Sequence, residues 1–144
     1  MAGQKPGSWC HVEIPTVSRE NAKKFYGRVF GWTFQDSPEM NYTIFSTGEG
    51  EIGGGFWNPP PDVPRVITNY ITVDDIDAKI AQVQEHGGKV AKAKMSVGSF
   101  GSFALIADPD GNVFGLWQTL KRSIKPAKKP AKAAKKPKGR SKRK

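Results

Sequence analysis

Apolar residues along the first 119 positions follow two local periods, and their order repeats once. β-Branched and aromatic residues over 9–17 predict a strand, after which apolar residues recur at helical spacing between Ser18 and Gly31. Ser18 is a suitable helix N-cap and Gly31 a suitable stop. Shorter strand-like segments follow at 32–34, 42–45 and 53–57. The pattern therefore predicts a strand, an amphipathic helix and three further strands.

The same succession returns 56 residues later. Residues 66–73 predict a strand, Asp74 a helix cap, and an apolar stripe begins at Ile76 and stops at Gly87-Gly88. Further strands are expected at 89–91, 102–107 and 112–118, the last two joined by a tight turn at Asp108-Pro-Asp-Gly. Because an internal repeat indicates duplicated units, we predict an α+β fold of two βαβββ modules, at about 9–58 and 66–119, linked through a proline-rich connector.

Charge is divided unevenly between this repeated part and the C-terminus. Thirteen of the 23 Lys and Arg residues, and none of the 13 Asp and Glu residues, lie at 121–144. Residues 1–120 therefore carry a net charge near −3 and residues 121–144 carry +13. The second segment has one sizeable apolar residue, Ile124, which is too little apolar surface to offset ordering entropy. We predict a domain at 1–120 and a disordered basic tail at 121–144.

A tail of this composition favours polyanionic partners. Its Pro-Ala-Lys-Lys phrasing resembles the tails of linker histones and of some bacterial DNA-associated proteins, and closely spaced cations bind phosphates with little sequence preference. The candidate nucleic-acid contacts are Lys128, Lys129, Lys135, Lys136, Arg140 and Arg143. The alternative is a solvated tail. An anionic membrane is a weaker third option, because no amphipathic or aromatic anchor accompanies the charge, and we expect no membrane partner.

Cysteine usage and hydropathy bear on the compartment. The single cysteine, Cys10, cannot form an intrachain disulfide, and no apolar run approaches the roughly 20 residues of a bilayer span. The first residues lack the apolar stretch of a secretory signal. We therefore predict a cytoplasmic protein, associated with the nucleoid if the tail binds DNA. Strand alternation predicts that Cys10 faces the helix layer, opposite to His11, as a small buried hydrophobe.

Several motifs resemble the vicinal oxygen chelate superfamily, which includes glyoxalases, bleomycin-resistance proteins and dioxygenases. They are His11-x-Glu13-Ile-Pro, Ala22-x-x-Phe25-Tyr26-x-x-Val29-Phe30-Gly31-Trp32, Val73-Asp74-Asp75-x-x-Ala78 and Asp108-Pro-Asp-Gly-Asn112. The resemblance covers about residues 9–119. It implies two modules whose mixed sheet curls around a shared cup. We also expect a homodimer.

Metal-dependent members of that superfamily draw four His and Glu ligands from the first and last strands of each module. His11 matches the first ligand. The other three positions fall on Gly53 or Gly54, on or beside Thr68, and on Gly115. Because catalytic zinc sites need about three protein ligands, we predict no metal and no cofactor, and glyoxalase I or dioxygenase chemistry by the family mechanism is not expected.

Two side chains that can handle protons remain in the implied cup. Strand alternation places His11 and Glu13 on one face, about 6–7 Å apart, where they can act as acid and base on a small substrate. They are the candidate catalytic residues. The alternative is that Glu13 satisfies a nearby backbone group or arginine, and that His11 is a hydrogen-bonded remnant of the family site.

Four aromatic residues on predicted strands are the candidate substrate-binding residues: Tyr42, Trp57, Tyr70 and Trp117. Aromatic side chains with polar tips commonly line ligand pockets. The alternative is that they form ordinary core. Glycines at the family's ligand positions leave room inside the cup, and this room either holds a ligand or is filled by neighbouring aromatic rings.

Two hypotheses about function follow. The first is a glyoxalase-like domain that binds a small metabolite or drug in its cup, with or without metal-free enzymatic activity. The second is a nucleic-acid-associated protein that is anchored by its tail and uses the domain as a dimeriser or ligand sensor. The two are compatible, and the substrate is not identified by the sequence.

Overall fold

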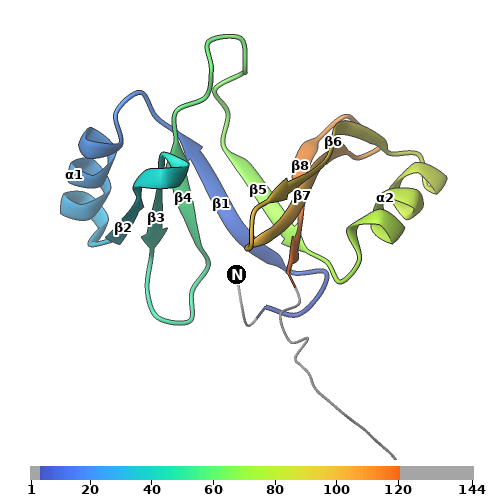
Figure 1. The fold of residues 1–144 in the computed structure, drawn as a ribbon, viewed down its shortest axis with the longest axis horizontal. Coiled ribbons are helices and arrows are strands. Elements are labelled where there is room, and N and C mark those ends of the chain that lie inside the picture. Colours follow the sequence, from blue (N-terminus) through green and yellow to red (C-terminus); the bar gives the residue numbers. More distant parts are fainter. Residues whose placement is uncertain (1–3, 121–144) are drawn as a thin grey trace, which may run out of the picture.

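The structure, a computed structural model, describes residues 4–120 and shows two consecutive βαβββ modules (Figure 1). The first module holds β1 (Trp9–Pro15), α1 (Arg19–Phe30), β2 (Thr33–Ser37), a 3-10 turn η1 (Pro38–Met40), β3 (Tyr42–Ser46) and β4 (Gly53–Trp57). The second holds β5 (Thr68–Thr72), α2 (Ile76–Glu85), β6 (Lys89–Val97), β7 (Gly101–Ala107) and β8 (Val113–Thr119). The predicted order of elements is confirmed.

All eight strands belong to one open, curled sheet in the order β2-β3-β4-β1-β5-β8-β7-β6. The modules meet where β1 pairs antiparallel with β5, and each of these strands pairs in parallel with the last strand of its own module. This register lines up Gly53, His11, Tyr70 and Gly115 across the centre of the sheet. The predicted α+β fold with a curled mixed sheet is confirmed, and the sheet does not close into a barrel.

The two helices lie on the outer face of the sheet, one toward each end (Figure 1). Helix α1 packs against β2 and β4, and α2 packs against β6, β7 and β8. The core beneath α1 is aromatic, with Phe45 and Phe56 at its centre, whereas the core beneath α2 is aliphatic, around Ile76 and Leu116. Since side chains alternate along a strand, the remaining strand residues face the opposite, concave side. No helix within residues 4–120 has the length and apolar character that a bilayer span requires.

Local signals place most element ends correctly. The Ser18 hydroxyl accepts the Asn21 amide at the start of α1, and Gly31 ends the helix at φ 75°. The second helix starts one residue later than predicted, because its N-cap is Asp75 and not Asp74. Its first residue, Ile76, is fully buried, and its amide donates to Gln118 Oε1 on β8 at 2.8 Å, so packing fixes this start.

The prediction that Cys10 faces the helices is wrong. Cys10 is 1% exposed and packs with Tyr70 and Trp117. The register between β1 and β5 shifts between Trp9 and His11, which is the mark of a β-bulge. The extra residue turns Cys10 and His11 toward the same side of the sheet, so simple alternation fails at this one point.

Candidate functional site

Four polar side chains from both modules converge at the centre of the concave face. Glu13 on β1 lies between two tyrosines: its Oε2 accepts the Tyr42 hydroxyl at 3.0 Å, and its Oε1 accepts the Tyr70 hydroxyl at 3.1 Å. The Tyr42 oxygen also lies 2.8 Å from His11 Nε2. We call these four residues the central cluster. His11 and Glu13 are therefore brought together, but through Tyr42 and not by direct contact.

Glycines on the strands beneath make room for the two tyrosine rings. A Cβ atom at Gly55 would overlap the Tyr42 ring, and a Cβ atom at Gly115 would overlap the Tyr70 ring. Gly115 is one of the positions at which the family resemblance led us to expect a metal ligand, and the Tyr70 ring lies over it. The glycine run at 53–55 was expected to leave room inside the cup, and at Gly55 this room is filled by the Tyr42 ring.

Burial sets the ionisation of the central cluster. Partial burial lowers the pKa of His11 to about 4, so the imidazole is neutral near pH 7. Burial also raises the pKa of the Glu13 carboxyl, and the two tyrosine hydroxyls oppose this rise only in part. Burial followed by the nearby Glu13 charge raises the pKa of both tyrosines, which therefore stay protonated. The carboxyl of Glu13 is thus the one member placed to take up a proton.

Hydrogen-bond geometry then fixes where the protons lie when Glu13 is ionised. Both tyrosine hydroxyls donate to the carboxylate. Because the Tyr42 O–H group points its proton at Glu13, the contact with His11 requires Nε2–H to donate to the Tyr42 oxygen, which leaves Nδ1 of the neutral ring as an acceptor. The chain His11–Tyr42–Glu13 therefore orients the carboxylate from one side, and Tyr70 holds it from the other.

The residues at the family's ligand positions do not fit a metal ion. Alternation places Gly53 rather than Gly54 on the concave face, since Gly54 contacts Phe45 on the helix side. Thr68 pairs directly with Glu13 across the modules, and Gly115 lies under Tyr70. Within residues 4–120 no three His, Cys, Asp or Glu side chains lie together in a way that could hold a metal. The residues at these positions therefore do not support catalysis by a bound metal ion.

The four candidate substrate-binding aromatics take different places. Tyr42 and Tyr70 belong to the central cluster. Trp117 is 8% exposed, packs with Tyr70, and donates its Nε1–H to Thr119 Oγ1 at 2.9 Å. Trp57 follows Phe56, which faces α1, so it points to the concave side and is partly buried. The candidate nucleic-acid contacts at 128–143 lie outside the described residues.

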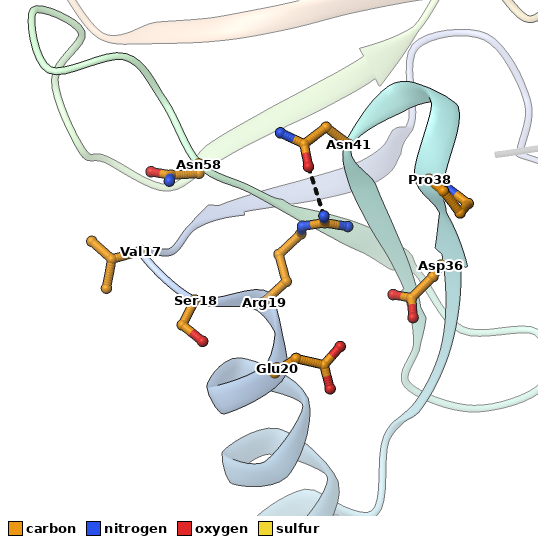
Figure 2. Close-up of a pocket in the computed structure, with 8 residues that line it drawn as sticks. All are labelled: Val17, Ser18, Arg19, Glu20, Asp36, Pro38, Asn41 and Asn58. Carbon is orange, nitrogen blue, oxygen red and sulfur yellow. Dashed lines mark hydrogen bonds between the residues drawn. The ribbon is translucent and has the colours of Figure 1, made fainter.

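A hollow of about 370 Å³ lies beside the start of α1 (Figure 2). It is lined by Val17, Ser18, Arg19, Glu20, Asp36, Pro38, Asn41 and Asn58. The Arg19 guanidinium donates to Asn41 Oδ1 at 2.6 Å (Figure 2). It also donates to Thr43 Oγ1 at 3.1 Å.

The two carboxylates of this hollow, Glu20 and Asp36, are paired with Lys23, which is not one of the lining residues. Lys23 forms ion pairs with Glu20 at 2.9 Å and with Asp36 at 2.8 Å, and Asp36 also accepts the Thr43 hydroxyl. Arg19 is the first residue of α1, where a cation interacts unfavourably with the helix dipole, and this feature of the sequence could have indicated that its side chain has other partners. Its hydrogen bonds tie α1 to β3. We therefore assign this hollow a structural role and treat the central cluster as the candidate site.

Comparison with known proteins agrees with this architecture. Residues 10–116 match the profile of the family described as Glyoxalase/Bleomycin resistance protein/Dioxygenase superfamily. The chain is 35% identical over 115 residues to "Putative glyoxylase CFP32" of Mycobacterium tuberculosis, covering 74% of this chain and 44% of that protein. It is 30% identical over 132 residues to the anthracycline biosynthesis protein DnrV of Streptomyces peucetius, covering 78% and 47%.

A solved structure supports the fold independently. A glyoxalase/bleomycin resistance protein/dioxygenase superfamily member from Vibrio splendidus superposes with a TM-score of 0.57 at 15% identity, covering 78% of this chain and all of that one. The chain spans less than half the length of the two curated relatives above. Their whole-length activities are therefore not carried over.

Proposed function

The chain belongs to the glyoxalase/bleomycin resistance protein/dioxygenase superfamily, and from this premise we propose that it binds a small organic molecule in its cup without a metal. The observation that carries the proposal is the central cluster: a partly buried carboxylate held by two tyrosines at the middle of the concave face. Polar groups converging among apolar walls are the usual form of a small-molecule site. The substrate-binding residues are Tyr42, Tyr70, Trp57 and Trp117.

Glu13 is the proposed proton acceptor of the site. Burial raises the pKa of its carboxyl, and carboxyls whose pKa is raised by burial serve as bases near neutral pH. His11 contacts Tyr42 and not Glu13, so its proposed role is to position the Tyr42 hydroxyl. The alternative, in which the cluster only stabilises the junction between the modules, predicts that no small molecule binds there.

Amide chemical shifts of the full chain, after removal of metals with EDTA, test this proposal. Three aromatic probes of one size are titrated separately: benzyl alcohol, benzylammonium and benzoate. Binding of at least one should shift amides of β1, β4, β5 and β8 near the central cluster. If none does, or if the shifted amides surround the hollow beside α1 instead, the cup is not the binding site.

A second function, attachment to nucleic acid through residues 121–144, is favoured by the 13 Lys and Arg residues and the lack of acidic residues there. The proposed contacts include Lys128, Lys129, Lys135, Lys136, Arg140 and Arg143. Random-sequence duplex DNA should bind the full chain but not a chain ending at Leu120, since residues 1–120 are net negative. If about six phosphates are neutralised, the slope of log K against log salt is near −5. Equal binding by both chains would contradict the proposal.

A further inference from the structure

The central cluster presents an unusual balance of hydrogen-bonding groups. From it we infer that the molecule bound in the cup carries a protonated amine, whose N–H groups face Glu13 between the rings of Tyr42 and Tyr70. This inference rests on the proposed function, because it names the class of ligand for the same site.

The first argument is an inventory of donors. The protons of Tyr42 and Tyr70 are both directed at Glu13, and the Nε2 proton of His11 is directed at Tyr42. The hydrogen-bonding sites left for a ligand are a second lone pair on each Glu13 oxygen, lone pairs on both phenol oxygens, and Nδ1 of His11. All of these groups are acceptors. A ligand that completes them must bring donors, and an alkylammonium brings up to three.

The second argument is charge. Glu13 is a partly buried carboxylate, and within the described part of the chain no lysine or arginine forms an ion pair with it, since those ion pairs involve Lys23 and Lys94. The neighbouring His11 is neutral near pH 7. Two tyrosine hydroxyls reduce the cost of this buried charge but do not neutralise it. A bound cation would supply the counter-charge that the protein omits.

The third argument is the nature of the walls. Tyr42 comes from β3 and Tyr70 from β5, on opposite sides of β1 in the sheet, so their rings approach Glu13 from two directions. Aromatic faces attract ammonium groups within about 6 Å of the ring centroid. Carboxylate and phosphate ligands would be repelled, because they would face the Glu13 carboxylate and the other acceptor atoms. The cluster therefore selects an organic cation over an anion.

The test uses the same EDTA-treated full chain and the three probes, titrated at pH 7 and followed by the amides of β1 and β5. Benzylammonium should bind at the cup at least about tenfold more tightly than benzyl alcohol, the ratio expected for charge-assisted hydrogen bonds. Benzoate should not shift these amides. The Glu13→Gln variant should weaken the binding of benzylammonium by about tenfold and weaken that of benzyl alcohol much less, so that the preference for the cation is lost.

The matched control is Glu49→Gln, which removes one negative charge from an exposed loop between β3 and β4. It should leave the affinity for benzylammonium unchanged. Tighter or equal binding of benzyl alcohol or benzoate in the cup overturns the ammonium inference and leaves the proposed function standing. If none of the three probes shifts the amides near the central cluster, both the ammonium inference and the proposed function are overturned. If Glu13→Gln does not fold, the ranking of the three probes on the natural chain decides alone.

Discussion

The two modules share one backbone plan but divide their side chains very differently. The first supplies His11, Glu13 and Tyr42 to the central cluster, whereas the second supplies Tyr70 alone. Beneath the helices the contrast continues, with an aromatic core around Phe56 in the first module and an aliphatic core in the second. The duplicated plan fixes how the strands pair, and the chemistry is concentrated in one copy.

The helices differ as well. Helix α1 leaves Phe25, Val29 and Phe30 between 55% and 59% exposed. The two phenylalanines belong to an aromatic group that continues inward through Tyr26 to Trp32. Helix α2 has no large hydrophobic residue among those that the structure shows to be exposed. Helix α1 thus presents large apolar side chains on its exposed face, and α2 does not.

The largest expected effect breaks the aromatic core of the first module. Phe56 is fully buried and packs against Phe45, Tyr26 and Phe34. Phe56→Ala should lower the free energy of unfolding by about 3–5 kcal/mol, because it leaves a large cavity. Ile76→Val, at the centre of the other core, should cost only about 0.5–1.5 kcal/mol. Urea denaturation of both variants measures the difference, and equal losses would show that the contrast between the cores has no energetic weight.

A smaller effect concerns the tyrosine-over-glycine packing of the cup. Gly115→Ala should cost about 1–3 kcal/mol, because the new methyl group displaces the Tyr70 ring. In a Tyr70→Ala background the same substitution should cost much less, since the ring that it strikes is gone. Four unfolding measurements complete this double-mutant cycle. Additive costs would show that Tyr70 does not lie over Gly115.

The carboxyl at the centre should be visible in the pH dependence of stability. Burial raises the pKa of Glu13 above its ordinary value of 4.5, so the folded state favours the protonated form. The natural chain should therefore lose stability relative to Glu13→Gln as the pH rises from 4.5 through the folded-state pKa, and the gap should stay constant above it. Thermal unfolding of both chains from pH 4 to pH 9 measures this gap. A gap that shrinks with rising pH would mean that the two tyrosines stabilise the charge more than burial penalises it.

The smallest expected effect is on the outer face of α1. Phe25→Gln should change the free energy of unfolding by no more than about 0.5 kcal/mol, because this ring is more than half exposed. Thermal melting at two protein concentrations checks it. A large loss would show that another surface, such as the second copy of a homodimer, covers the helix.

Much of this architecture was predictable because it depends on local and periodic signals. Helical spacing, the Ser18 cap, the Gly31 stop and the 56-residue repeat together determine two βαβββ units, and Asp108 accepts the amides of Asp110 and Asn112 in the expected turn. The bulge that turns Cys10 inward has no such signal. It arises from the pairing of β1 with β5, two strands that are far apart in sequence.

The candidate site was predictable as a set of residues and not as a network. Alternation along β1 placed His11 and Glu13 on one face, and aromatic residues on strands nominated Tyr42 and Tyr70. Their joint attachment to Glu13 could not be foreseen, because it depends on strand register between modules and on the space above Gly55 and Gly115. The family resemblance predicted that three metal-ligand positions lack His and Glu, and the structure shows that the Tyr70 ring lies over one of them, Gly115.

The central claim is that a carboxylate held by two tyrosines, and not a metal ion, forms the centre of the candidate site. Metal analysis of the full chain, purified without a histidine tag and followed by EDTA treatment, tests it most directly. The account predicts far less than one equivalent of zinc, nickel, iron or manganese per chain and an unchanged melting temperature after chelation. About one equivalent of metal per chain, lost on chelation together with a fall in melting temperature, would contradict it.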